Sequence, residues 1–190
     1  GAWALVAGGG RQGVALGGRA GAGRNPVSPG LGRQRLGLLA RGAGPAGMVG
    51  GQAIDLGAGG QKLDQPALEQ MHRHKTGALI EASVLLGALA SGQASEAQLA
   101  ALSRYAGAIG LAFQVQDDIL DVESDTATLG KTQGADIARD KPTYPALLGL
   151  DQAKTYAREL HDQALDALAG FDESAAALRA LAGYIIQRRH

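Results

Sequence analysis

The feature that most constrains the fold of this chain is a polar stretch inside an apolar, helical run, Phe113-Gln-Val-Gln-Asp-Asp-Ile-Leu-Asp121. Its amide and acidic side chains recur at helical spacing, as Gln114, Asp117, Asp118 and Asp121. On an α-helix these positions follow one face, whereas Val115 and Ile119 fall on another. The stretch therefore predicts a helix whose polar face has a role of its own.

Three carboxylates within two turns repel one another, by roughly a few tenths of a kcal/mol on an exposed helix and by more where water is excluded. A positive partner would offset that repulsion. Asp117 and Asp121 are spaced to hold Mg²⁺, which usually keeps several waters and completes its coordination with substrate phosphate oxygens. The pattern therefore indicates magnesium and a diphosphate, and the alternative is an acidic helix face that is only solvated.

Four further motifs accompany this stretch in a fixed order. They are Gly47-Met-Val-Gly-Gly-Gln-Ala-Ile-Asp-Leu56, His74-Lys-Thr-Gly77, Gly130-Lys-Thr-Gln-Gly-Ala-Asp136 and Asp140-Lys-Pro-Thr-Tyr-Pro145. Together the five motifs resemble those of the trans-polyprenyl diphosphate synthases, and most of all the bacterial farnesyl diphosphate synthases. The resemblance covers about residues 44–190, and the aspartate stretch matches the second of the family's two aspartate-rich motifs.

The resemblance implies an all-α fold, an antiparallel helical bundle of the isoprenoid synthase type that is truncated and preceded by an irregular segment. It implies a Mg²⁺-dependent prenyltransferase of isoprenoid biosynthesis. Such an enzyme condenses an allylic diphosphate with isopentenyl diphosphate to a short-chain prenyl diphosphate, farnesyl or geranyl. The family also implies a homodimer.

Site residues follow from the same resemblance. The expected metal ligands are Asp117, Asp118 and Asp121, with Asp118 in a supporting role. The expected diphosphate-binding residues are Lys75, Lys131 and Lys141. Catalysis is expected to use Lys75, Thr76 and Gln114, the last through its carbonyl oxygen near the allylic cation. Lysines beside an acidic face can hold diphosphate oxygens that the metal leaves free, and the alternative is that the two loop lysines are only solvated.

Composition narrows the remaining possibilities. The 190 residues permit one domain with a sizeable core, and the absence of cysteine excludes disulfides and thiolate metal sites. No apolar run is long enough to span a membrane and no signal peptide opens the chain, so a cytoplasmic protein is expected. His72 and His74 are expected to be partly exposed polar residues rather than metal ligands, because no third ligand has matching spacing.

Residues 1–46 differ from the rest. They hold nearly half of the chain's 30 glycines, six arginines, and no aspartate or glutamate. Such a segment is expected to lack a packed fold, which places a boundary between a low-complexity part, 1–46, and a helical part, 47–190. A nucleic-acid-binding arm is disfavoured because the segment has no lysine and one aromatic residue, Trp3.

The family's first aspartate-rich motif should lie upstream of Gly47, where this sequence has no aspartate. A further hypothesis is that residues 1–46 are translated out of frame. The absent initiator methionine suggests a fragment. The sequence therefore favours an enzyme of this family, and the alternative is a catalytically inactive helical remnant that lacks the first motif.

Apolar periodicity predicts the helices of the second part. One runs over about 65–89 after a start signal at Asp64, interrupted at Lys75 and Thr76, and another begins at a Ser95–Gln98 capping box and ends near Val122. Two more are expected over 151–169 and 173–187. The polar, glycine-broken sequence after residue 122 predicts a loop, and residues 188–190 are expected to be exposed.

Overall fold

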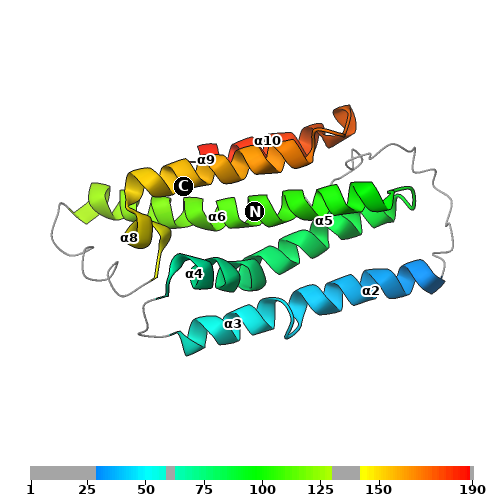
Figure 1. Cartoon of the computed structure of the whole chain (residues 1–190), viewed down its shortest axis with the longest axis horizontal. Coiled ribbons are helices and arrows are strands. Elements are labelled where there is room, and N and C mark those ends of the chain that lie inside the picture. The colour runs from blue at the N-terminus through cyan, green and yellow to red at the C-terminus, as the bar shows by residue number, and fades with distance from the viewer. Residues whose placement is uncertain (1–28, 59–62, 130–141, 189–190) are drawn as a thin grey trace.

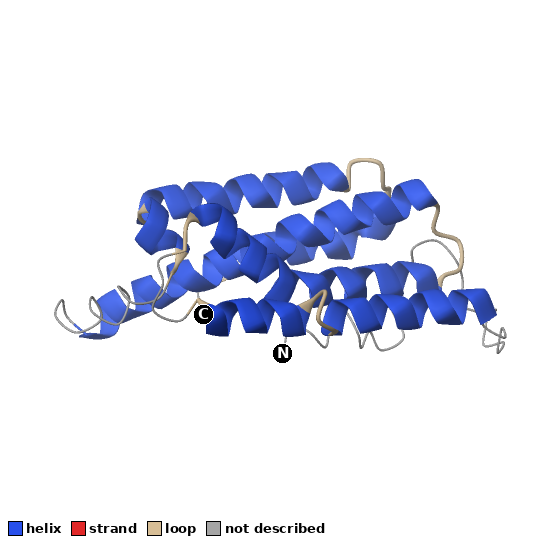
Figure 2. Ribbon diagram, turned by 60° about the horizontal axis from the view of Figure 1, so that its bottom comes forward, coloured by secondary structure: helices blue, strands red, loops and turns tan. Residues whose placement is uncertain are grey.

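The structure is a computed structural model that describes residues 29–58, 63–129 and 142–188. Within those ranges the chain is helical and contains no strand (Figure 2), which confirms the expected all-α fold. The elements are α2 (Pro29–Ala43), α3 (Met48–Gly57), α4 (Gln65–His72), η1 (Arg73–Gly77), α5 (Ala78–Ala90), α6 (Glu96–Leu129), α8 (Tyr144–Leu148), α9 (Leu150–Ala167), η2 (Glu173–Ala175) and α10 (Ala176–Gln187). No described helix combines the length and apolar character that crossing a membrane requires.

Helix α6 lies in the middle of the bundle (Figure 1). Helices α9 and α10 pack along one side of it, and α5 with η1 packs along the other. Beyond them, α2 lies against α5 and α3 lies against η1. The aspartate stretch is therefore carried by the element that contacts both sides of the molecule.

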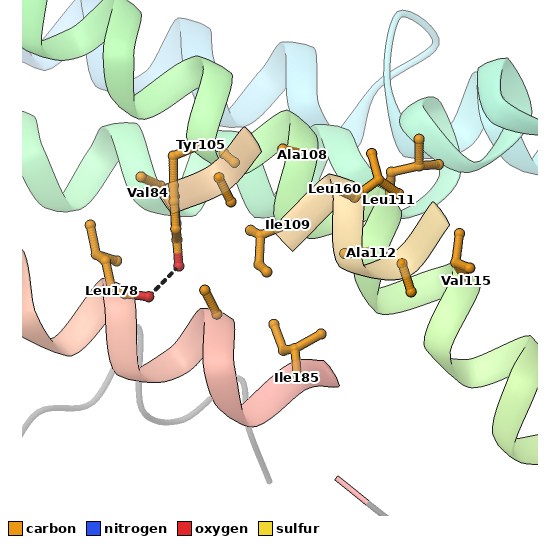
Figure 3. Packing of buried hydrophobic residues seen from close by; sticks show 14 of the residues in the cluster. Val84, Tyr105, Ala108, Ile109, Leu111, Ala112, Val115, Leu160, Leu178 and Ile185 are labelled. Atoms are coloured by element: carbon orange, nitrogen blue, oxygen red, sulfur yellow. Dashed lines mark hydrogen bonds between the residues drawn. The ribbon is translucent and has the colours of Figure 1, made fainter. Parts of the chain in front are cut away.

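The core forms where the apolar stripes of these helices meet. On α6, Val115 and Ile119 are fully buried, as their spacing predicts, and each such side chain contributes about 1.5–3 kcal/mol when removed from water. Tyr105 reaches across to α10, where its hydroxyl donates a 2.8 Å hydrogen bond to the carbonyl oxygen of Leu178 (Figure 3). The buried phenol thus keeps its polar atom satisfied.

The predicted helix starts are confirmed in atomic detail. The Asp64 side chain accepts a 3.0 Å hydrogen bond from the Ala67 N–H at the start of α4. At the start of α6, the Gln98 N–H donates to Ser95 Oγ at 3.2 Å, and the Ser95 N–H donates to Gln98 Oε1 at 2.9 Å. This reciprocal capping box satisfies two N–H groups that the helix leaves without partners.

The predicted helix over 65–89 is present as three consecutive elements, α4, η1 and α5. Its expected interruption is the π-helical segment η1, which carries Lys75 and Thr76 and ends at Gly77. A single wide turn of this kind re-aims side chains without ending the helix.

Part of the segment 1–46 is folded, contrary to expectation. Helix α2 packs on α5, where Arg35 Nη2 donates a 2.5 Å hydrogen bond to the Leu89 carbonyl oxygen. Gly42 is buried so close to α5 that a Cβ there would lie 2.9 Å from the Ala82 Cβ. Tertiary packing therefore compensates for weak local helix propensity. Residues 1–28 lie outside the described part of the chain.

The loop predicted after Val122 is also wrong over its first turns, because α6 continues to Leu129. Residues 123–129 include no glycine or proline, so their polar composition does not itself stop a helix. Lys154 Nζ of α9 forms a 2.6 Å ion pair with Glu123 Oε1 on this extension.

Candidate metal and diphosphate site

Asp118 is the buried member of the aspartate stretch. Its Oδ2 accepts a 3.1 Å hydrogen bond from the Tyr144 N–H at the start of α8, and its Oδ1 accepts a 3.2 Å bond from Gln114 Nε2. Burial raises the pKa of Asp118 to about 6, although both hydrogen bonds favour the charged form, and the neighbouring Asp121 and Asp117 carboxylates add to the rise. Asp118 thus fastens α6 to α8.

Asp117 faces the C-terminal end of α10. Its Oδ1 accepts a hydrogen bond and ion pair from Arg188 Nη2, and its side chain is 37% exposed. The Arg188 side chain is only 13% exposed, which corrects the expectation that the basic end of the chain is solvated. Residues 189 and 190 lie outside the described part.

Asp121 lies one turn beyond Asp117 on α6 and is exposed. The part of the chain that the structure describes contains no cluster of three acidic, histidine or cysteine side chains able to hold a metal unaided. Magnesium does not require one, because it is commonly bound through one or two carboxylates together with waters and substrate phosphates. The donor chemistry of Asp117 and Asp121 therefore fits Mg²⁺ bound together with a diphosphate.

Lys75 lies in η1 beside α3, where its Nζ forms a 2.6 Å ion pair with Asp55 Oδ2. Both side chains are about one third exposed, at 36% and 35%. The pair depends on a close approach of the α3 and η1 backbones, because a Cβ on Gly51 would lie 2.1 Å from the backbone nitrogen of Lys75. Thr76 is half-buried in the same turn.

The Lys75 turn also packs against α6. A Cβ on Gly110 would lie 3.3 Å from the Gly77 Cα, and Gly110 is one helical turn before Gln114. The structure thus brings η1, which carries Lys75, alongside the part of α6 that leads into its acidic face, formed by Asp117 and Asp121. In the described structure, the ion pair of Lys75 is with Asp55 rather than with the aspartates of that face. Lys131 and Lys141 lie outside the described residues and stay predictions.

His72 is buried, not partly exposed as expected. Neither of its ring nitrogens has a hydrogen-bond partner among the described residues, and its ring centroid lies 5.8 Å from that of Tyr144. Burial lowers its pKa to about 4, and the nearby Lys75 charge lowers it further while Asp55 opposes the shift. His74 is half-buried, with Nδ1 2.8 Å from the Gln70 carbonyl oxygen.

Three partners of the site were missed by the sequence reasoning. Asp55 had a local signal, since it stands one turn from Gln52 in a glycine-rich motif, but its pairing with Lys75 spans 20 residues. Tyr144 and Arg188 are 26 and 71 residues from the aspartates that they contact. Local spacing carries no information about such contacts.

Comparison with known proteins supports one family. The polyprenyl synthetase family model matches residues 43–181. Farnesyl diphosphate synthase of Escherichia coli (strain K12) is 59% identical over 153 residues, which cover 79% of this chain and 51% of that protein.

Solved structures agree with that assignment. An FPP/GFPP synthase from Zymomonas mobilis matches with a TM-score of 0.70 and 35% identity, covering 84% of this chain and 51% of that one. A geranyltransferase from Helicobacter pylori, complexed with magnesium and isoprenyl diphosphate, matches with a TM-score of 0.67 and 31% identity. The match covers 86% of this chain and 53% of that one.

The chain spans about half the length of the curated relatives it matches. Its family-model match nevertheless extends over most of its own residues, and the sequence and fold comparisons point the same way. This chain belongs to the polyprenyl synthetase family.

Proposed function

We propose that this chain carries the allylic-diphosphate end of a short-chain prenyltransferase site, which condenses an allylic diphosphate with isopentenyl diphosphate to farnesyl or geranyl diphosphate. The observation that carries the proposal is the division of labour on α6. Asp118 is buried and bonded to the Tyr144 N–H, whereas Asp117, which pairs with Arg188, is half-buried and Asp121, one turn further on, is exposed. Similarity to the farnesyl diphosphate synthase of E. coli supports the same chemistry.

Asp117 and Asp121 would hold Mg²⁺ together with the diphosphate, and the metal would neutralise the charge that develops on the leaving group. Asp118 keeps this turn of α6 in place through Tyr144 and Gln114, so its neighbours are presented in a fixed direction. A preorganised carboxylate pair needs little rearrangement when the metal–diphosphate complex arrives.

Lys75 would supply a second positive charge to the diphosphate. Asp55 holds its ammonium at 2.6 Å and so orients it while leaving it partly exposed. Lys131 and Lys141 are proposed to add further contacts. The allylic cation would lie near Thr76 and the Gln114 carbonyl oxygen, with the apolar interior of the bundle excluding water.

A second candidate is a catalytically inactive remnant of such an enzyme. It is favoured by one observation, that no aspartate or glutamate precedes Asp55, so residues 1–54 supply no second acidic motif. Both candidates share the allylic end of the site and differ in turnover. A homodimer and a cytoplasmic location stay predictions.

Calorimetric titration tests the shared part of the proposal. We expect dimethylallyl diphosphate to bind the wild-type chain in the presence of Mg²⁺ and not in its absence, because the carboxylates repel a diphosphate without the metal. Asp121→Ala should weaken Mg²⁺-dependent binding at least tenfold with unchanged helix content. Glu159→Ala, which removes an exposed carboxylate from α9, is the matched control and should bind like wild type.

Equal affinity in wild type and Asp121→Ala would show that the acidic face is only solvated. Binding that is as tight without Mg²⁺ would likewise reject a metal-dependent site on α6.

A further inference from the structure

Among the described residues, Arg188 makes several contacts close to Asp117. It directly follows α10, and its guanidinium reaches α6 at three points within one turn. Nη2 donates to the Asp117 carboxylate and, at 3.2 Å, to the Phe113 carbonyl oxygen. The guanidinium carbon lies 4.3 Å from the centroid of the Phe113 ring. A further bond of 3.3 Å from Nε to the Ile185 carbonyl oxygen fixes the side chain to its own helix.

These contacts make the charge a permanent part of the site. An arginine stays protonated throughout the physiological range, and its planar fork suits a carboxylate and an aromatic face together. Because the Arg188 side chain is only 13% exposed, water screens its charge less than it would that of a solvated lysine. The negative charge of the Asp117 carboxylate is therefore balanced by the Arg188 guanidinium before any ligand binds.

The positive charge of Arg188 has opposite effects on a bare metal ion and on a metal–diphosphate complex. A bare divalent cation that binds Asp117 must share the carboxylate with the guanidinium or displace it, and two positive charges then repel across a short distance. A metal–diphosphate complex is negatively charged overall, because a diphosphate ester carries more negative charge than one divalent metal cancels. The same guanidinium attracts this complex.

We propose that Arg188 is a positioning residue that makes the acidic face of α6 selective for metal already bound to a diphosphate over the bare metal ion. The inference rests on the proposed function, since it takes Asp117 and Asp121 as the metal-binding pair. It adds that binding of metal and diphosphate is coupled through Arg188. Linkage makes such coupling reciprocal, so each ligand strengthens the binding of the other.

Two titrations on Arg188→Met test this coupling. Methionine keeps a long apolar stem against Phe113 and removes the charge. We expect Mn²⁺ alone, followed by electron paramagnetic resonance, to bind the variant about tenfold more tightly than wild type. Dimethylallyl diphosphate at saturating Mg²⁺, followed by calorimetry, should bind about tenfold more weakly. Both fold-changes correspond to the strength of one partly buried charge interaction.

Three further variants serve as comparisons. Arg188→Lys keeps the charge and should retain most of the discrimination, and Arg188→Gln provides a second neutral side chain should the methionine variant be unstable. Lys154→Met removes a positive charge of α9 that is paired with Glu123 on α6, the helix that carries Asp117, and should leave both affinities within about twofold of wild type.

The proposal is overturned if both affinities of the neutral Arg188 variants move in the same direction or stay within twofold of wild type. It is also overturned if Lys154→Met reproduces the opposite shifts, because long-range charge would then explain them. Failure of the proposed function is a different result, in which wild type itself shows no Mg²⁺-dependent binding of dimethylallyl diphosphate.

Discussion

His72 illustrates how burial changes the chemistry of a single side chain. The sequence predicted a partly exposed polar residue at this position of α4. In the structure, the His72 ring is buried against Tyr144, and neither ring nitrogen has a hydrogen-bond partner among the described residues. Desolvation disfavours the imidazolium form, and the pKa of His72 therefore falls to about 4. At neutral pH the residue is an uncharged ring beside the Lys75 turn.

The depressed pKa of His72 predicts a dependence of stability on pH. Because the unfolded chain takes up the proton near pH 6.5 and the folded chain only near pH 4, the free energy of unfolding should fall as the pH drops through this window. The loss attributable to His72 is roughly 2–3 kcal/mol. Urea unfolding of wild type and His72→Phe at several pH values between 4 and 7.5 measures it.

The difference between the two proteins isolates His72, because other groups contribute equally to both. Asp118, whose raised pKa acts in the opposite direction, is one of them. His74→Phe is the matched control, since that ring is only half-buried. A difference that stays constant from pH 7.5 to pH 4 would show that His72 titrates normally in the folded chain.

At the scale of elements, the position of Lys75 depends on how closely α3 approaches η1. Gly51 permits that approach, since a Cβ there would lie 2.1 Å from the backbone nitrogen of Lys75 and 2.5 Å from the Lys75 Cα. Both neighbouring atoms are backbone atoms, which cannot rotate out of the way. The helix pair must therefore separate if the glycine is replaced.

Gly51→Ala should destabilise the chain by about 2–3 kcal/mol, because overpacking forces backbone shifts. The same substitution should weaken Mg²⁺-dependent diphosphate binding by moving the Lys75–Asp55 pair. Gly57→Ala, on the same helix with nothing within 4 Å of the added Cβ, should change stability by less than about 1 kcal/mol. Denaturant midpoints of the two variants compare these costs, and equal midpoints would contradict the close approach.

The helices that sequence periodicity predicted are those whose apolar stripes face the core of the bundle. Over 65–89 and in the first turns of α6, the pattern and the capping residues agreed, so local and tertiary preferences coincide. Helix α2 was missed because its stability comes from packing on α5. The turns after Val122 were missed because a solvated helix and a polar loop have similar composition.

The sequence assigned some residues of the candidate site, and their roles stay predictions. Helical spacing and the shared motif singled out Asp117, Asp118 and Asp121, and the family motif singled out Lys75. The partners of Lys75, Asp118 and Asp117 were not predicted, because Asp55, Tyr144 and Arg188 reach the site from other parts of the chain. The burial of Asp118 and the pairing of Asp117 depend on Tyr144 and Arg188.

At the scale of the whole molecule, the charge distribution bears on turnover. The acidic face of α6 provides one set of carboxylates, and residues 1–54 provide none. The chain spans about half the length of relatives such as the farnesyl diphosphate synthase of E. coli. Under the proposed function, the allylic end would bind its metal and diphosphate, while residues 1–54 would supply no second acidic motif.

Removal of a single preorganised charged group commonly lowers a catalytic rate about 10²- to 10³-fold, and the lack of a whole acidic motif should cost more. We therefore expect the chain by itself to bind dimethylallyl diphosphate with Mg²⁺ yet to form no prenyl product with isopentenyl diphosphate. Product formation and ligand binding must be measured on the same preparation, so that loss of folding is not mistaken for loss of chemistry.

The most direct measurement follows radiolabelled isopentenyl diphosphate into extractable prenyl products, with dimethylallyl diphosphate and Mg²⁺ present. The farnesyl diphosphate synthase of E. coli serves as the active control. We predict no labelled product above the Asp121→Ala background from a chain that binds dimethylallyl diphosphate in the parallel titration. Sustained Mg²⁺-dependent product that Asp121→Ala abolishes would show instead that these 190 residues form a complete site, and would contradict the assignment of the allylic end alone.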